Sequence, residues 1–338
     1  MLAELVRYCL ISSVFKPIRV EGRKIPLRSQ INLLIEAPFG TGKTYIIETI
    51  RQAGLGLVMD RWTQNAFYGS ISRQGTIIPP ITVLAAGSTV LIDEFQSIPL
   101  QFKQPLLKLL EEQIVNRELL NVVPEPEDQF CERDKDGRKW WKIERDFYWI
   151  KAHSGYLYTH IRASYLIVTA HLGKSELEKM LMSRCITLRL DFQLEDLYTD
   201  IDIKLDDIHE LRQKLKSYQG SYTAKQDKEF LDLVVQEATP ANIPYNYYRR
   251  IRDNLIRIDN CINALKSVGV EVDYTAYDFL PLLLAGIKGI KFRPIELEVY
   301  AKLPKVSEDE LEFVELLRQK GVVREVNGKF VRCCNFVR

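Results

Sequence analysis

The sequence predicts an α/β fold, in which a parallel sheet with surrounding helices precedes a helical segment and a small domain that ends in a β-hairpin. Three observations support this prediction. The apolar run 31–35 precedes a glycine-rich loop and a helix-forming segment, and the mostly apolar run 89–92 ends in two adjacent carboxylates. Near the C-terminus, two short strand-like runs flank Asn327-Gly328. Buried parallel strands are continuous apolar runs, and Asn-Gly is a strong hairpin signal.

Length, net charge and residue composition limit the classes of protein to which the chain can belong. The chain has 338 residues, enough for roughly two or three domains, and a formal net charge of +2, so a surface that binds nucleic acid would have to be local. The longest apolar run, 279–287, is too short to cross a bilayer and contains Pro281. The N-terminus shows no signal-peptide pattern, and the six cysteines lack zinc-ligand spacing. We expect a cytoplasmic protein that does not enter a membrane.

The glycine-rich loop has the pattern of a phosphate-binding loop. It consists of Ala37, Pro38, Phe39, Gly40, Thr41, Gly42, Lys43 and Thr44. The glycines let the backbone turn tightly with N–H groups facing inward, and the next helix presents its positive N-terminal end. Lys43 can reach the β and γ phosphates, and the Thr44 hydroxyl can bind Mg²⁺. Ala37 replaces the first glycine of G-x-x-x-x-G-K-[ST], yet the loop still predicts binding of ATP and Mg²⁺.

Two carboxylates, Asp93 and Glu94, directly follow the run 89–92. Open α/β sheets bind ligands at the carboxyl ends of their strands. Phosphoryl transfer depends mainly on positioning and on charge neutralisation. We therefore expect Asp93 to hold Mg²⁺ and Glu94 to orient and polarise the attacking water. Together with the glycine-rich loop, this pair predicts ATP hydrolysis.

The remaining elements follow from apolar periodicity and from turn residues. We expect a second strand at 55–59, a loop or hairpin at 60–80, and further strands at 164–169 and 186–190. Helices are expected at 2–15, 99–114, 202–215, 225–237, 244–264 and 308–320. The order of expected elements near the C-terminus, a helix followed by two short strands, differs from that in the rest of the chain. We therefore expect a separate C-terminal domain at 266–338.

A β-hairpin insertion is expected around 125–160, before the strand at 164–169. Turn signals lie at Asp136-Gly137 and near residues 153–155, and three of the four tryptophans fall in this segment. Basic residues, including Lys142 and Lys151, alternate with the aromatic ones. Such a mixture suits nucleic acid, because phosphates attract the charges and bases stack on the rings. Alternatively, the aromatic residues pack the hairpin onto the domain or a neighbouring subunit.

The C-terminal segment resembles a winged-helix domain. Ser307 is a suitable cap for the helix 308–320, Gly321 ends that helix, and the hairpin around Asn327-Gly328 has a basic tip. Winged helices bind DNA or make protein contacts. We expect DNA contacts from Lys329 and Arg332, which flank the tip.

These motifs together resemble the AAA+ ATPase family over about residues 25–265. The glycine-rich loop and the pair Asp93-Glu94 are similar to its two nucleotide-binding motifs, segment 166–171 to its sensor-one strand, and segment 181–185 to the segment that carries the arginine finger. The resemblance implies a nucleotide-binding domain at 1–190 that contains the insertion, a helical lid at 191–265, and a winged-helix-like domain at 266–338.

The resemblance also implies roles for single residues. Arg184 would enter the ATP site of a neighbouring subunit and stabilise γ-phosphate charge, which requires a homo-oligomer, usually a hexameric ring. The sensor-one polar residue would be Thr169 or His171. Ala241 stands where RuvB-like proteins have the sensor-two arginine, and Arg249 or Arg250 would take that place at the ATP.

Within the family, the chain resembles the hairpin-bearing groups, namely RuvB-type branch-migration motors, MCM-type helicases and MoxR-type chaperones. We expect an oligomeric ATPase that couples hydrolysis to DNA translocation or remodelling. One alternative is a MoxR-like chaperone that remodels proteins. Another is an initiator or loader that uses ATP to switch its binding to DNA.

Overall fold

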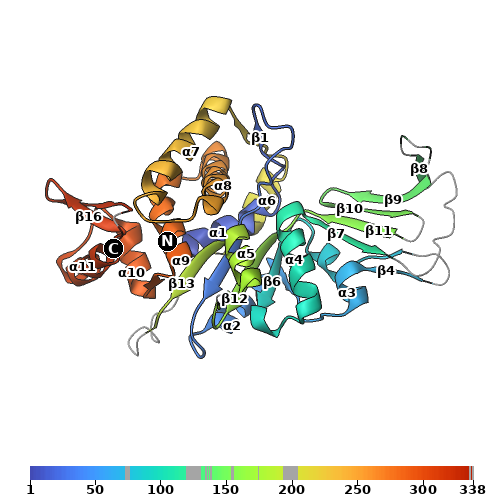
Figure 1. Cartoon of the computed structure of the whole chain (residues 1–338), viewed down its shortest axis with the longest axis horizontal. Helices are drawn as coiled ribbons and strands as arrows, with labels where there is room; N and C mark the ends of the chain where they lie inside the picture. The colour runs from blue at the N-terminus through green and yellow to red at the C-terminus, as the bar shows by residue number, and fades with distance from the viewer. Residues whose placement is uncertain are drawn as a thin grey trace.

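The centre of the computed structural model is a six-stranded parallel sheet with strand order β15-β13-β2-β12-β6-β3 (Figure 1). Its strands are β2 (Asn32–Glu36), β3 (Gly56–Val58), β6 (Thr89–Asp93), β12 (Ser164–Thr169), β13 (Ile186–Leu190) and β15 (Lys291–Phe292). The structure describes residues 1–72, 77–118, 131–133, 135, 137, 139–153, 156–173, 175–192, 205–334 and 336. The predicted α/β class with a parallel sheet is confirmed.

Helices cover both faces of this sheet, which explains why the central residues of β2, β6 and β12 are apolar. Successive side chains of a strand point to opposite faces. Leu33 and Ile35 of β2 pack in one core with α1 (Leu2–Ser12) and α2 (Lys43–Gln52). Leu34 packs on the other side in a second core with α4 (Leu100–Glu112) and α5 (Glu176–Arg184).

The first core continues without a break into the C-terminal half of the chain. It includes residues of α6 (Ile208–Leu215), α7 (Ala224–Ala238), α8 (Tyr248–Ser267), α9 (Leu280–Lys288), α10 (Pro294–Lys302) and α11 (Leu311–Gln319). β15 pairs with β13 and so adds a C-terminal strand to the main sheet. At Gly286 of α9, a Cβ atom would lie 2.0 Å from the Thr187 carbonyl oxygen, so only glycine permits this approach of helix to strand.

The insertion is a five-stranded antiparallel sheet with strand order β7-β11-β10-β9-β8, larger than the expected hairpin. Its strands are β7 (Ile114–Glu118), β8 (Cys131–Arg133), β9 (Lys139–Arg145), β10 (Tyr148–His153) and β11 (Tyr156–Ile161). In Figure 1 this insertion sheet extends from the body at the end opposite α11. Ile150, Ala152 and Leu157 of its inner face are buried in the second core. Asp136 and Gly155, from the two expected turns, lie outside the described residues.

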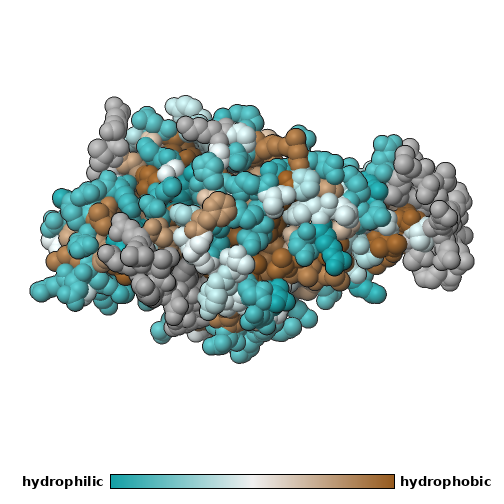
Figure 2. All heavy atoms as spheres, turned by 90° about the horizontal axis from the view of Figure 1, so that it is seen from below, coloured by the Kyte–Doolittle hydropathy of each residue, from teal (hydrophilic) through white to brown (hydrophobic). Residues whose placement is uncertain are grey.

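Several short elements lie between the longer strands and helices. The segment expected as a loop or hairpin contains α3 (Gln64–Tyr68) and the paired strands β4 (Ser70–Ile71) and β5 (Ile77–Ile78). β1 (Arg19–Val20) pairs in parallel with β14 (Ser221–Tyr222). Among the described residues, no helix is long and apolar enough to span a bilayer. The face shown in Figure 2 is largely hydrophilic, with separate apolar patches.

The C-terminal hairpin consists of β16 (Val323–Val326) and β17 (Lys329–Arg332), as expected. Asn327 and Gly328 have φ values of 52° and 74°, the left-handed conformation that a tight two-residue turn requires at both positions. The Ser307 N–H donates to the Glu310 carboxylate at 2.9 Å where the helical segment begins. Lys329 is exposed beside the tip.

Arg332, in contrast, is engaged within the C-terminal region. It donates hydrogen bonds to three backbone oxygens at the end of α10, those of Tyr300, Ala301 and Leu303. Its guanidinium also pairs with Asp278 at 2.9 Å, and the side chain is only 12% exposed. This corrects the expectation for Arg332, because its guanidinium joins the hairpin to the end of α10 and leaves little surface for a contact with DNA.

Replacing Arg332 by methionine should lower the free energy of unfolding by about 3 kcal/mol, because Asp278 and three carbonyl groups would lose their shared partner. The matched control is Arg324→Met on β16, where the side chain is exposed and the change should stay below about 0.5 kcal/mol. Urea unfolding followed by circular dichroism measures both. Equal stabilities of the two variants would contradict the packing role of Arg332.

Candidate nucleotide-binding site

The glycine loop, the pair Asp93-Glu94 and the two expected sensor residues lie together at the carboxyl ends of the strands of the main sheet. In the register of the strands, Thr169 at the end of β12 lies beside Glu36 at the end of β2, and Val168 lies beside Asp93 at the end of β6. From β2 the chain crosses to β3, returns through β6 and β12, and then crosses to β13 on the other side of β2. Sheets with such a reversal of strand order bind ligands at the carboxyl ends beside it.

The glycine loop, residues 37–44, joins β2 to α2. Gly40 and Gly42 have φ values of 77° and 78°, and Gly42 caps the N-terminus of α2. A Cβ atom at either position would meet no other atom within 4 Å, so glycine is required here by the backbone conformation and not by lack of space. The Thr41 hydroxyl donates to the Pro38 carbonyl oxygen at 2.7 Å and braces the turn. The Phe39 side chain is exposed.

Lys43 is buried beneath this loop. Its ammonium donates to the carbonyl oxygens of Ala37 and Pro38, at 2.7 Å each. The Glu94 carboxylate lies 3.7 Å away, and the Phe39 ring centroid 5.1 Å away. The loop thus holds one positive charge at the N-terminus of α2, where the helix also favours an anion.

Thr44 and Asp93 bring two oxygen-bearing side chains together at the end of β6. The Thr44 hydroxyl donates to Asp93 Oδ2 at 3.1 Å. Asp93 Oδ1 is buried and has no hydrogen-bond partner among the described residues. A buried polar atom of this kind normally has a water or an ion as partner. Mg²⁺ is usually held by one or two protein oxygens together with waters and substrate phosphates, so these two residues fit that ion.

Glu94 is held in position by backbone contacts. Its Oε2 accepts a hydrogen bond from the Ala170 N–H at 3.1 Å, and its own N–H donates to the Val168 carbonyl oxygen at 3.0 Å. Its φ value of 60° is unusual for a residue other than glycine and costs about 1–3 kcal/mol. The side chain is 29% exposed, so the carboxylate is fixed by the protein and open to solvent.

The two residues expected as sensors also lie at this edge. Thr169 is fully buried, and its hydroxyl donates to the side-chain oxygen of Gln96, a residue that the sequence did not indicate. His171 is 79% exposed, and its Nδ1 lies 3.6 Å from a Glu36 oxygen. Their role towards a nucleotide remains a prediction.

A buried ion pair beneath the loop was missed. Glu36 Oε2 pairs with Arg189 Nη1 of β13 at 2.6 Å, and its Oε1 accepts from the Leu172 N–H at 3.0 Å. Arg189 Nε in turn donates to the Gly286 carbonyl oxygen at 3.2 Å. A signal was present in the sequence, since Glu36 directly follows the apolar run 31–35 and a charged residue at the end of a buried strand requires a partner.

Arg184 and Arg249 lie at the opposite edge of the sheet. The Arg184 carbonyl oxygen accepts a hydrogen bond from Asn32, the first residue of β2, and its guanidinium pairs with Glu111 at 2.7 Å. Arg249 lines a pocket with Arg184, and no residue of the glycine loop lines that pocket. This corrects the expectation that Arg249 sits at the ATP of its own chain. The expected role of Arg184 concerns another subunit and stays a prediction.

The expected DNA-contacting lysines of the insertion sheet lie opposite each other on β9 and β10. Lys142 pairs with Glu144 at 2.6 Å, and the Lys151 ammonium lies 5.5 Å from the centroid of the Trp149 ring. Their contact with nucleic acid remains a prediction.

In comparisons with known proteins, neither a family model nor a curated protein matches this chain.

Proposed function

We propose that the chain is an oligomeric ATPase of the AAA+ type that couples ATP hydrolysis to translocation on DNA or to its remodelling. The observation that carries this proposal is the convergence of Lys43, Thr44, Asp93 and Glu94 at the carboxyl ends of β2 and β6. Asp93 Oδ1, which is buried without a partner among the described residues, supports the presence of a cation beside it.

Each residue has a role that follows from its position. Lys43 and the N–H groups at the start of α2 bind the phosphates, and Thr44 and Asp93 would hold Mg²⁺. When bound, Mg²⁺ neutralises phosphate charge. Glu94, fixed by the Ala170 N–H and open to solvent, holds a water and accepts its proton.

The test of this site is ATP binding by Lys43→Ala. The variant should bind ATP roughly thirtyfold more weakly, because a charged hydrogen-bond donor contributes about 2 kcal/mol. The control is Arg51→Ala on the same helix, whose exposed side chain pairs with Glu48 and should leave affinity unchanged. Titration with a fluorescent ATP analogue measures both, and wild-type affinity of Lys43→Ala would exclude the glycine loop as the phosphate site.

The DNA part of the proposal is supported by the exposed Lys329 and by the aromatic and basic residues of the insertion sheet. It is tested by measuring ATPase activity with and without single-stranded, duplex and branched DNA. Stimulation by one of these supports a DNA-acting ATPase. Activity that no DNA changes would contradict it and favour the protein-remodelling alternative, which uses the same ATP site.

A further inference from the structure

A second positively charged site lies near the amino ends of the strands of the main sheet, whereas the glycine loop lies at their carboxyl ends. It is a pocket of about 790 Å³ between the segment 17–28 and the ends of α4, α5 and α8. We call it the arginine pocket, because six arginines line it: Arg23, Arg28, Arg184, Arg249, Arg250 and Arg257. Lys24 lines it as well, and its lining carboxylates are Glu111, Glu112 and Asp253.

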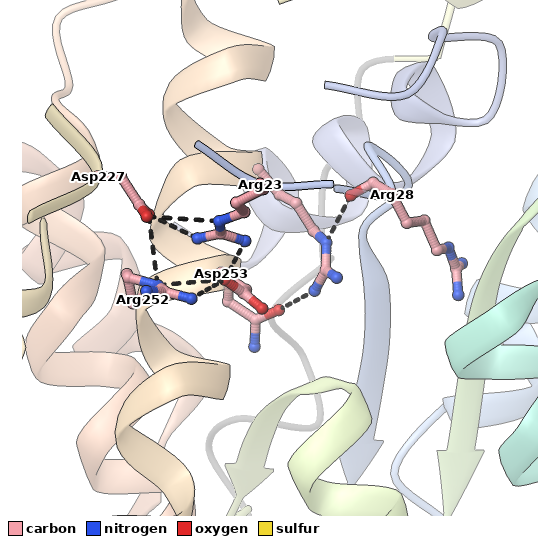
Figure 3. A network of polar contacts seen from close by, with 7 residues as sticks. Arg23, Arg28, Asp227, Arg252 and Asp253 are labelled. Carbon is pink, nitrogen blue, oxygen red and sulfur yellow. Dashed lines mark hydrogen bonds and ion pairs between the residues drawn. The ribbon is translucent and has the colours of Figure 1, made fainter. Parts of the chain in front are cut away.

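These carboxylates are already paired. Arg23 binds Asp227 and Asp253, and Arg252 also contacts Asp253 (Figure 3). Glu111 is shared by Arg184 and Arg250, and Glu112 lies 3.8 Å from Lys108. The pocket therefore keeps an excess of positive charge.

Arg28 contributes a positive charge that no carboxylate among the described residues pairs with. Its side chain is 9% exposed, its Nη2 donates only to the neutral oxygens of Asn32 and Ala163, and its Nε has no partner among the described residues. Burial, together with the charge of Arg257, lowers the pKa of Arg28 to about 9. In Figure 3 its guanidinium points away from the network around Asp253. A buried charge without a counter-charge is costly, so this position favours an anionic ligand.

Arg257 is in a similar situation beside Arg28. Its Nε donates to the Arg28 carbonyl oxygen at 2.9 Å, and its Nη1 donates to Asn254 Oδ1 at 2.7 Å. Both acceptors are neutral. Burial lowers the pKa of Arg257 as well, although Asp253 opposes this shift. Two neighbouring guanidinium groups thus share the pocket without a carboxylate of their own.

The arginine pocket continues into the outer face of the insertion sheet through His160. This residue lines the pocket, and its ring stacks on Trp149 with centroids 5.5 Å apart and planes 8° apart. Burial and the charges of Arg162 and Arg28 lower the pKa of His160 to about 4, so the ring is neutral near pH 7. On the same face, Lys151 lies opposite Tyr158.

We propose that the arginine pocket and this outer face together bind a single-stranded nucleic acid, with backbone phosphates at Lys24 and Arg249, attracted also by the charges of Arg28 and Arg257, and with bases stacked beside Trp149. A positive groove next to aromatic rings is the arrangement by which proteins bind single strands. The inference rests on the proposed function in that the ATPase acts on DNA. It assigns the contact to the sheet edge opposite the glycine loop.

The charge part is tested with the double variant Lys24→Gln/Arg249→Gln, which changes two exposed residues of the pocket. Its binding to a labelled oligodeoxythymidine longer than about 16 nucleotides is measured by fluorescence anisotropy across a salt titration. The salt slope should fall by about 1.4, since each phosphate contact with a single strand contributes about 0.7. The matched control, Arg51→Gln/Arg318→Gln, removes two exposed arginines elsewhere. An unchanged slope in the pocket variant, or an equal fall in the control, overturns the proposal.

The stacking part is tested with Trp149→Ala. This variant should bind the oligonucleotide roughly fivefold or more weakly, with an unchanged salt slope because no charge is removed. Inorganic tripolyphosphate serves as a competitor without bases. If Trp149→Ala binds like the wild type and tripolyphosphate displaces the oligonucleotide at equal phosphate concentration, the pocket is a site for small anions and the proposal fails.

Lys43→Ala separates this proposal from the proposed function. The variant should bind the oligonucleotide like the wild type, because the glycine loop lies at the other sheet edge. Wild-type protein that hydrolyses no ATP but shows the expected slopes would refute the proposed ATPase and leave the nucleic-acid site standing. If the protein hydrolyses ATP but the pocket variant and Trp149→Ala bind the oligonucleotide like the wild type, the proposed ATPase stands and the nucleic-acid site is refuted.

Discussion

Glu94→Gln should bind ATP with wild-type affinity and hydrolyse it about a hundredfold to ten-thousandfold more slowly. Glutamine has the same shape, so the hydrogen bond from the Ala170 N–H and the loop geometry can persist. An amide, however, cannot accept the proton of the attacking water. Lys43, the main cation for the phosphates, stays in place.

Hydrolysis is measured by phosphate release and binding by a fluorescent ATP analogue. The control is Glu48→Gln on α2, which also removes one carboxylate but from an exposed position paired with Arg51. Turnover of Glu94→Gln at the wild-type rate would show that another group activates the water.

Arg184→Ala should keep ATP binding and lose about a thousandfold or more of the hydrolysis rate in the assembled protein. An arginine that reaches the γ phosphate from a neighbouring subunit stabilises charge in the transition state by this order. Within one chain, Arg184 is 12% exposed and bound to Glu111, so it must leave that partner to act.

Two further measurements separate this role from a structural one. Glu111→Gln removes the partner and keeps the arginine, so it should retain hydrolysis if Arg184 acts on a neighbour and lose it if the ion pair itself matters. Mixing Arg184→Ala with Lys43→Ala subunits should restore part of the activity at interfaces that combine one intact loop with one intact arginine. Wild-type turnover by a dilute, demonstrably monomeric protein would exclude action between subunits.

Local patterns predicted most of the main sheet and the loop. The strands at 164–169 and 186–190 have the expected bounds, because apolar runs flanked by polar residues define buried strands on their own. The positions of Lys43, Thr44, Asp93 and Glu94 followed for the same reason, since each motif is short and lies at a strand end.

Features that depend on distant partners could not be predicted in this way. Nothing in the two-residue strand β15 indicates that it pairs with β13, about a hundred residues earlier. The alternation in β17 shows that Arg332 and Phe330 share a face, but not that the end of α10 covers Arg332. Arg249 looked suitable for the ATP because of its helix, whereas its position depends on how α8 packs against the ends of α4 and α5.

The contact chain from Glu36 through Arg189 to Gly286 has a mechanical consequence. Glu36 directly precedes the glycine loop. Arg189 forms an ion pair with Glu36 and donates a hydrogen bond to Gly286 of α9. At Gly286 the helix contacts β13 without an intervening side chain. A displacement of the end of β2 would therefore be transmitted to α9 through the side chain of Arg189. Because α9 shares one hydrophobic core with α10 and α11, such a displacement would move the C-terminal helices together with the hairpin β16–β17, which lies at the opposite end of the molecule from the insertion sheet in Figure 1.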